Sequence, residues 1–552
     1  MTENVKDYDG NTRIAVGIVV DEYALPLLKN TLNSAKLLSD NIFVLAVGIN
    51  LDGQNFDNEE SGIFFYHADN TDDESATRNI LIDHVEAAHQ AGTIEADWLV
   101  WMNPGDEFDE RTLDAFLHFV EHDSNREFIY MMVLHRLFRD NRLRHDFDEE
   151  TIEARLMPLR KGVRFQDRVK ASLVGRSAGL MTQISAAPGR FLLPSKKIDP
   201  SKASIRANRT LQILDQMEND GDLIHDDFLA ARAEAQFVLG NFVEARRLFL
   251  QLAQDASRSD LKLSAYYYLW ETFAVAPIPD VEITKTLVEG LDLFPVDTQL
   301  LTFLGSHLQR TGKLDLAVRT FETAVQHGRT SLDVWHRLHI GEIAITSLAL
   351  CHRLQNRNNK AIQVLEENRE QVEDKTEYNR HLLDLYIAEN QEDKASELAG
   401  EIWGDVDLDL IRLALKGACT AKTGEWDKAL TPLKESYQQG CRDALCLRWY
   451  ALALLATQQF RAAVEILTQW ITIQPDNSEA KSYLAAAQRP EQFGETLKRI
   501  RDAHLRSLGV MGNKMTPRKP NIRIEDAVRE MIQASGSGGK IMGFKPKIKE
   551  KH

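Results

Sequence analysis

The chain has 552 residues, of which 43% are hydrophobic and 27% charged, with a formal net charge of -17 at pH 7. This length exceeds what one hydrophobic core usually serves, so we expect two or more domains. The negative charge repels nucleic acid phosphates, and no apolar run approaches the roughly 18 residues that span a bilayer. Residues 1–10 are polar and lack the features of a secretory signal. We therefore expect a cytoplasmic protein with no membrane span and no nucleic acid partner.

Alternating apolar and amphipathic segments open the chain. Residues 12–20 form a short apolar run of the kind that makes a buried parallel strand, and residues 25–38 follow with helical periodicity. Further apolar runs cover 42–50 and 62–68, and a helix is predicted at 78–91. This alternation predicts a doubly wound sheet in an α/β domain.

A fourth apolar run, at residues 97–102, is followed by the turn sequence NPGDE at 103–107. Ligands of open parallel sheets bind at the carboxyl ends of the strands. The sequence therefore predicts that this turn lies at the ligand-binding edge of the sheet. We place this domain at residues 11–198.

The region 205–490 is predicted to be a stack of helical pairs. The stretches GNFVEA, GKLDLA and GEWDKA each indicate a tight turn between two helices. Four alanines are spaced by 34 residues, which is the period of a tetratricopeptide repeat: Ala361, Ala395, Ala429 and Ala463. A large apolar residue follows the alanine by four positions in several repeats and is expected to fill the same helix face: Phe249, Phe321, Leu365, Leu433 and Leu467.

Stacked repeats of this type form a concave surface that usually binds a protein or peptide partner. The alternative, that the repeats only brace the first domain, stays open. The cysteines all fall in the helical half without the paired spacing of a metal site, so we expect buried thiols rather than disulfides or zinc ligands: Cys351, Cys419, Cys441 and Cys446. Residues 508–552 are predicted to be a mostly disordered basic tail.

The order of segments in the first domain resembles the family 2 glycosyltransferases, whose domain has a GT-A-like, Rossmann-related mixed sheet. It resembles in particular bacterial members in which tetratricopeptide repeats follow the transferase. Asp52-Gly53 resembles the aspartate-glycine turn of that family, and Arg78-Asn79 matches its arginine-asparagine pair. NPGDE stands where the family carries Asp-x-Asp, and residues 155–169 resemble the segment before its Val-His-Glu.

This resemblance implies roles for residues near the strand ends. Asp106 and Glu107 would hold a divalent metal, Mn²⁺ or Mg²⁺, that neutralises the nucleotide diphosphate leaving group. Asp106 and Asp167 are the catalytic candidates, Asp167 as a base for the acceptor hydroxyl. Candidate contacts to the nucleotide sugar are Asp21, Glu22, Asp52, Arg78 and Asn103. For each acid the alternative is a turn residue or helix cap.

The chain also departs from the pattern of the family. Asn103 replaces the first carboxylate of Asp-x-Asp, and Val169-Lys170-Ala171 stands in place of Val-His-Glu. Two hypotheses follow. In the first, the protein is a glycosyltransferase that moves a sugar from a nucleotide-diphosphate donor to a protein, peptide or glycan acceptor recruited by the repeats. In the second, the transferase fold is catalytically degenerate and the chain is a repeat-based interaction scaffold.

Overall fold

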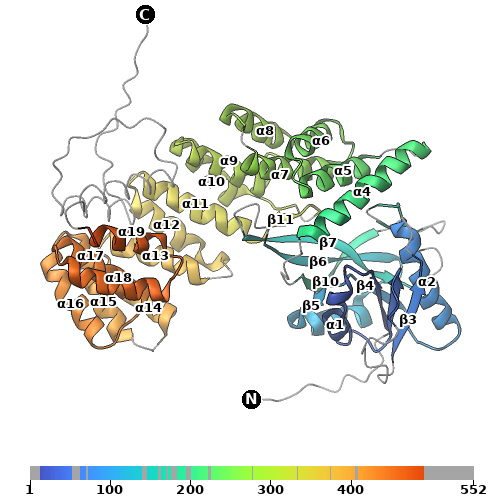
Figure 1. Ribbon diagram of the computed structural model, residues 1–552, viewed down its shortest axis with the longest axis horizontal. Helices are drawn as coiled ribbons and strands as arrows, with labels where there is room; N and C mark the ends of the chain where they lie inside the picture. Colours follow the sequence, from blue (N-terminus) through green and yellow to red (C-terminus); the bar gives the residue numbers. More distant parts are fainter. Residues whose placement is uncertain are drawn as a thin grey trace, which may run out of the picture. The chain divides into compact units, whose positions relative to one another are not determined.

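The computed structural model shows an α/β domain with a mixed sheet, followed by a tetratricopeptide-like helical solenoid (Figure 1). Its contacts divide the chain into two compact units. Unit 1 comprises Met1–Pro295 and Thr330–Leu338, and unit 2 comprises Val296–Arg329 and His339–His552. The structure describes residues 13–51, 62–69, 73–139, 146–159, 163–169, 172–175, 183–193, 200–221, 225–276, 278–331, 333–372, 375–404 and 408–489.

One half of the main sheet is parallel. Its strands are β1 (Ile14–Val20), β2 (Ile42–Val47), β3 (Ile63–Ala68) and β4 (Trp98–Met102), in the order β3-β2-β1-β4. β1 pairs in parallel with β2 and with β4, and β2 pairs in parallel with β3. The strands predicted from the four apolar runs are thereby confirmed.

The other half of the sheet is mixed. β7 (Asp146–Pro158) runs antiparallel to both β4 and β6 (Phe128–Arg139), and β10 (Gln183–Leu193) is parallel to β6. The expected doubly wound pattern therefore stops at β4. The short connection between β6 and β7 accounts for the antiparallel pairing of these two strands, because parallel neighbours need a longer crossover. The short strand β5 (Glu107–Phe108) pairs with the end of β10.

Smaller elements complete the α/β domain. β8 (Val163–Gln166) and β9 (Ser172–Gly175) form a separate antiparallel pair, and β11 (His336–Arg337) adds to β7. The helices are α1 (Leu25–Ala35), α2 (Glu74–Gln90), η1 (Glu110–Thr112), α3 (Leu113–His118) and the π-helical turn η2 (Phe119–Asp123).

Both faces of β1, β2 and β4 are buried, and successive residues of each strand point to opposite sides, whereas the edge strand β3 is partly exposed. Val16 and Ile18 of β1 pack in one cluster with Leu28 of α1. Ala15 of the same strand packs in a second cluster with Leu81 of α2. The helices α1 and α2 thus contribute to apolar layers on opposite faces of the sheet. The carboxyl ends of the parallel strands, including that of β4, lie between these two layers.

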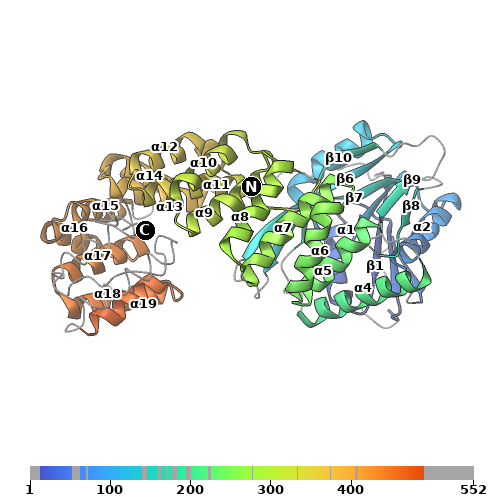
Figure 2. The same ribbon diagram turned by 90° about the horizontal axis from the view of Figure 1, so that it is seen from above.

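The helical region begins in unit 1 and continues in unit 2, where successive hairpins stack in chain order (Figure 2). Unit 1 holds α4 (Pro200–Asp220), α5 (Asp226–Val238), α6 (Phe242–Asp255), α7 (Ser259–Val275) and α8 (Asp280–Leu293). Unit 2 holds α9 (Thr298–Arg310), α10 (Leu314–His327), α11 (Ile340–Leu354), α12 (Asn358–Asn368), η3 (Arg369–Gln371), α13 (Lys375–Ala388), α14 (Glu392–Trp403), α15 (Leu408–Lys422), α16 (Trp426–Gln438), α17 (Ala444–Ala456), α18 (Phe460–Ile473) and α19 (Ser478–Ala487). The change from strands to helices falls between β10 and α4; the boundaries proposed from the sequence stay predictions, and the tail at 508–552 lies outside the described residues.

The repeated alanine is a contact point between the two helices of a hairpin. In each case it is the fourth residue of the second helix, with none of its surface exposed. The residues are Ala245, Ala317, Ala361, Ala395, Ala429 and Ala463. A left-handed residue stands two positions before each of these helices and reverses the chain: Gly240, Gly312, Asn356, Asn390, Gly424 and Gln458. The predicted tight turns are confirmed.

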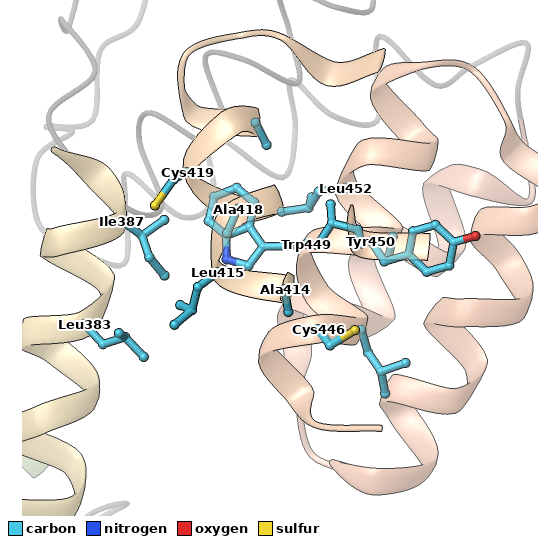
Figure 3. Packing of buried hydrophobic residues seen from close by; sticks show 14 of the residues in the cluster. Leu383, Ile387, Ala414, Leu415, Ala418, Cys419, Cys446, Trp449, Tyr450 and Leu452 are labelled. Carbon is cyan, nitrogen blue, oxygen red and sulfur yellow. The ribbon is translucent and has the colours of Figure 1, made fainter. Parts of the chain in front are cut away.

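The largest apolar cluster lies in unit 2 and joins successive first helices. Figure 3 shows the Trp449 indole of α17 next to Ala418 and Leu415 of α15. Cys419 belongs to the same cluster, and burial raises the pKa of its thiol to about 12. All four cysteines are free and buried, which confirms the expected structural thiols. In the described part of the chain, no helix has the length and hydropathy needed to cross a bilayer.

Candidate functional site

Asp106 lies inside the protein at the carboxyl end of β4, with none of its surface exposed. Its Oδ2 atom accepts a hydrogen bond from the backbone N–H of Asn103 at 2.8 Å and lies 2.9 Å from Nη1 of Arg155. Gly105 has φ +103°, and its N–H donates to Oγ1 of Thr31 at 2.8 Å, which fastens the turn to α1. The acid predicted to hold a metal is therefore bound within a tight turn and balanced by a buried cation.

Arg155, on β7, connects several elements around that turn. It is only 1% exposed, and its Nη1 donates to the carbonyl of Trp101 at 3.2 Å. Its Nη2 lies 3.0 Å from Oε2 of Glu153, and its guanidinium carbon stands 5.7 Å from the centre of the Phe191 ring. Sequence reasoning included Arg155 only as the first residue of the family-like segment 155–169 and gave its side chain no role. The alternation of Glu153 and Arg155, which places both on one strand face, is the available signal.

Arg78 lies beside the same cluster. Its guanidinium pairs with Glu74 one turn earlier on α2 and stands 4.8 Å from the ring centre of Phe165 and 5.3 Å from that of Trp101. Burial lowers the pKa of Arg78, and the nearby positive charge of Arg155 acts in the same direction. This arginine therefore joins α2 to β4 and β8 through a charge pair and ring contacts.

Asn79, the partner of Arg78 in the predicted motif, has a bracing role. Its side chain donates to the carbonyl of Phe165 and accepts from the N–H of the same residue, both at 2.9 Å. Asn103 accepts a hydrogen bond from Nε1 of Trp101 at 3.2 Å, and Glu107 accepts one from Nδ2 of Asn30 at 3.3 Å. Both contacts hold the turn to neighbouring elements.

The remaining predicted residues lie at other points of the domain. Asp21 accepts a hydrogen bond from the N–H of Ala24 at 2.8 Å within the turn before α1, and lies 3.6 Å from Arg206 of α4. Glu22 is exposed. Asp167 is exposed after β8, with φ +79°. Asp52 lies outside the described residues, so its predicted contact to a nucleotide sugar stays a prediction.

The structure thus brings Arg78, Asn103 and Asp106 to one place, around Trp101 and Arg155. No group of three or more His, Cys, Asp or Glu side chains within the described segments could hold a metal ion. Oδ2 of Asp106 already lies beside the guanidinium of Arg155, so a cation at Asp106 would have to displace a buried ion pair. The metal role of Asp106 and Glu107 stays a prediction.

A second concentration of charge lies in unit 2, on the first helices of successive hairpins. We name it the charged row. Its members come from α11, α13, α15, α17 and α19, and each is half-buried. They are Arg353, Asp384, Lys422, Arg448 and Glu479. The row contains three cations and two acids, and sequence reasoning did not identify it.

Arg448 is the centre of the charged row. Its guanidinium lies 3.7 Å from Oδ1 of Asp384 and 3.3 Å from Oε1 of Glu479, and its side chain is 17% exposed. The Nζ atom of Lys422 stands 5.3 Å from the centre of the Trp449 ring. Burial, with Arg448 and Arg353 nearby, lowers the pKa of Lys422 to about 7.

In comparisons with known proteins, the helical region resembles solved tetratricopeptide repeat structures, and no family is identified. No protein-family model matches the sequence, and no curated protein does. Among solved structures, a tetratricopeptide repeat protein from Parabacteroides merdae is 12% identical, with 48% of this chain and 98% of that chain covered and a TM-score of 0.33. The C-terminal part of a repeat protein from Cytophaga hutchinsonii is 12% identical, with coverages of 52% and 99% and a TM-score of 0.30.

A third solved structure, the Cut9-Hcn1 hetero-tetramer of the APC/C, is 15% identical. The match covers 52% of this chain and 49% of that chain, with a TM-score of 0.27. The chain therefore spans about half the length of that protein. Similarities this weak give no information about the partners or the activity of this chain.

Proposed function

We propose that this protein is an interaction scaffold that binds a partner chain on the first-helix face of unit 2. The observation that carries the proposal is the charged row, which places ionisable side chains on the first helices of four neighbouring hairpins and on α19 while leaving them partly open to solvent. Taking charges out of water is costly unless they are paired or used. If the first helices only braced another domain, apolar residues at these positions would make them more stable.

The state of the strand-edge acid supports the same proposal. Asp106 is enclosed and paired with Arg155, so metal binding there would require breaking a buried ion pair. The sequence also has Asn103 where the glycosyltransferase pattern has a first aspartate. These features favour a transferase-like sheet that is maintained as part of the scaffold.

Site-specific photo-crosslinking tests the scaffold proposal. A photoreactive benzoyl-phenylalanine is introduced at His381, which is exposed on the first helix α13, in cells that produce the full chain. The matched control carries it at Gln363, which is exposed on the second helix α12. We expect discrete protein adducts from position 381 and few from position 363. Equal labelling from both positions, or adducts from neither, would contradict the proposal.

A nucleotide-sugar transferase is the second candidate. It is favoured by the position of the turn at Asn103 and Asp106, which follows the last strand of the parallel half, where open sheets bind ligands. Arg78 and Arg155 could balance a diphosphate without a metal. Thermal unfolding of the full chain with UDP and a panel of UDP-sugars, with and without Mn²⁺, separates the candidates.

The scaffold proposal expects an unchanged melting temperature with every nucleotide. A saturable rise that is lost in Arg78→Gln, while Arg111→Gln retains it, would favour the transferase. Arg111 is a suitable control because its side chain is 76% exposed and pairs with Asp109 away from the turn.

A further inference from the structure

We propose that His118 and His122 form a surface site for a divalent transition metal ion, with Cu²⁺ bound most tightly. His118 is the last residue of α3, and His122 lies in the π-helical turn η2 that follows it directly. The inference goes beyond the scaffold proposal and does not depend on it. Its basis is the geometry of the turn, the spacing of the two imidazole rings and the carboxylate beside each ring.

The π-helical turn determines which side chains stand together. Residues five apart point to different sides of an α-helix, because that helix has 3.6 residues per turn. In η2 the N–H of Ser124 donates to the carbonyl of Phe119, five residues earlier, at 2.9 Å. This wider turn keeps both the fourth and the fifth following residue near the first, and His122 and Asp123 both lie beside His118. Such turns are rare and occur frequently at functional sites.

The two imidazole rings stand at the distance that a shared metal ion requires. Their centres are 4.6 Å apart and their planes are inclined at 62°. An imidazole nitrogen binds a transition metal at about 2.0 to 2.1 Å, which puts the ring centre about 3.2 Å from the ion. Two rings at a right angle around the ion then have centres about 4.5 Å apart, and a tetrahedral angle separates them by about 5.2 Å. The observed distance is closer to the right-angled geometry that Cu²⁺ and Ni²⁺ prefer.

Each imidazole has a carboxylate near one of its two ring nitrogens. Nδ1 of His118 lies 3.8 Å from Oδ2 of Asp123, and Nε2 of His122 lies 3.6 Å from Oε2 of Glu121. A histidine that ligates a metal usually directs its second ring nitrogen at a carboxylate, which fixes the tautomer and makes the ligating nitrogen more basic. Nε2 of His118 and Nδ1 of His122 are then the ligating atoms.

The chemistry of the site selects the class of ion. The side chains of His118 and His122 are 64% and 54% exposed, so an ion from solvent can reach both rings. No third His, Cys, Asp or Glu among the described residues completes a three-ligand group here, so water occupies the remaining positions. Imidazole ligands suit Cu²⁺, Ni²⁺ and Zn²⁺, whereas Mg²⁺ and Ca²⁺ prefer oxygen. Among the first three, Cu²⁺ has the highest affinity for nitrogen ligands.

Titration of the full chain with the chlorides of Cu²⁺, Ni²⁺, Zn²⁺ and Mg²⁺ tests the site. Isothermal titration calorimetry measures each affinity, and electron paramagnetic resonance of the Cu²⁺ complex shows how many nitrogen atoms bind the ion. We expect Cu²⁺ to bind more tightly than Ni²⁺ or Zn²⁺, and an excess of Mg²⁺ to leave its binding unchanged. The spectrum at one equivalent of Cu²⁺ should show the splitting of two imidazole nitrogens.

Matched variants assign the binding to this turn. His118→Gln and His122→Gln are each expected to weaken Cu²⁺ binding about tenfold or more and to remove the two-nitrogen spectrum. His327→Gln is the control, because His327 is exposed at the end of α10 and has no histidine four residues away. Asp123→Asn should weaken binding but keep both nitrogens, because its carboxylate only orients His118. Copper bound elsewhere on the chain is common to all variants and cancels in the comparison.

The possible results divide clearly. A two-nitrogen spectrum that is lost in both turn variants and kept in His327→Gln supports the site. The absence of saturable Cu²⁺ binding, a spectrum with oxygen ligands alone, or equal affinities in His118→Gln and His327→Gln would each overturn it. Circular dichroism checks that the variants are folded, which is expected because the substituted side chains are exposed.

Discussion

The Nη1 atom of Arg155 lies 2.9 Å from Oδ2 of Asp106, and at most 1% of either side chain is exposed. Arg155 belongs to β7, and Asp106 belongs to the turn after β4. The two lie close together because β7 pairs with β4 in the sheet. In a buried pair of this kind the loss of one partner leaves an uncompensated charge, which is more costly than the pair is favourable. The ion pair is therefore the feature that most constrains this edge of the sheet.

Asp106→Asn is expected to destabilise the α/β domain by about 3 kcal/mol, because it leaves Arg155 with only the partly exposed Glu153 as a charged partner. Hydrogen exchange of β4 and β7 in the full chain measures the loss. Asp114→Asn, at an exposed position of α3, is the control and should stay within about 0.5 kcal/mol of the wild type. Equal protection from hydrogen exchange in both variants would show that the Asp106–Arg155 pair does not stabilise the domain.

Gly417→Ala is expected to destabilise the α15–α16 hairpin, although alanine normally favours a helix by about 1 kcal/mol. A Cβ atom at this position would lie 2.4 Å from Cγ of Leu433, so one of the helices must move, at a cost of about 1 to 3 kcal/mol. Gly400→Ala is the control, because its nearest neighbour would be Leu408 at 4.0 Å, and it should be stabilising. Hydrogen exchange of each hairpin measures whether its variant is more or less stable than the wild type. A change in the same direction for both variants would refute the packing argument.

The turns before the second helices allow a reciprocal test. Gln458 has φ +61° and Gly424 has φ +86°, a region in which only glycine is unstrained. Gln458→Gly is expected to stabilise its hairpin and Gly424→Gln to destabilise its own, each by about 1 kcal/mol. Urea unfolding followed by hydrogen exchange compares the two. Losses of stability in both variants would mean that side-chain contacts outweigh the backbone.

The pH dependence of stability should report the position of Lys422. Its pKa is about 7 in the folded protein and 10.5 in the reference state, so between these values the unfolded chain holds a proton that the folded chain has released. The contribution of this group to the free energy of unfolding therefore rises with pH from about 7 to about 10.5 and is flat below. The groups facing it are Arg353, Arg448, Asp384 and Glu479.

Melting temperatures of the wild type and of Lys422→Met, measured from pH 6 to pH 10, test this sign. We expect the wild type to gain relative to the variant as the pH rises. Lys428→Met on the exposed surface of α16 should show a constant difference from the wild type. A constant difference would show that the amine stays charged in the folded chain, and a wild type that becomes less stable relative to the variant would show that the pKa of Lys422 is raised there.

Features that repeat along the sequence were predictable from it. The alanines at a 34-residue spacing identified the second helices, since each fills the same contact in every hairpin. The strands β1, β2 and β4 were visible as apolar runs because both of their faces are buried. Local patterns of this kind are set by secondary structure and need no knowledge of distant partners.

Features made by distant residues were not predictable. Asp106 had the position of a metal ligand, but its partner Arg155 comes from a strand whose direction the sequence did not reveal. The charged row was missed for a related reason. Arg353 stands eight residues before its repeat alanine, and Arg448 stands fifteen before its own, so no fixed period aligns them. Only the stacking of first helices brings such positions into one line.

The short strand β11 has a consequence for how the protein can be divided. His336 and Arg337 pair with Glu150 and Glu149 of β7, and Arg337 also pairs with Glu271 of α7, although residues 296–329, which precede this segment, belong to unit 2. The polypeptide thus leaves unit 1, returns to it and leaves again. A single proteolytic cut or a simple truncation cannot release either unit intact, and expression of the sheet alone would expose the edge that β11 covers.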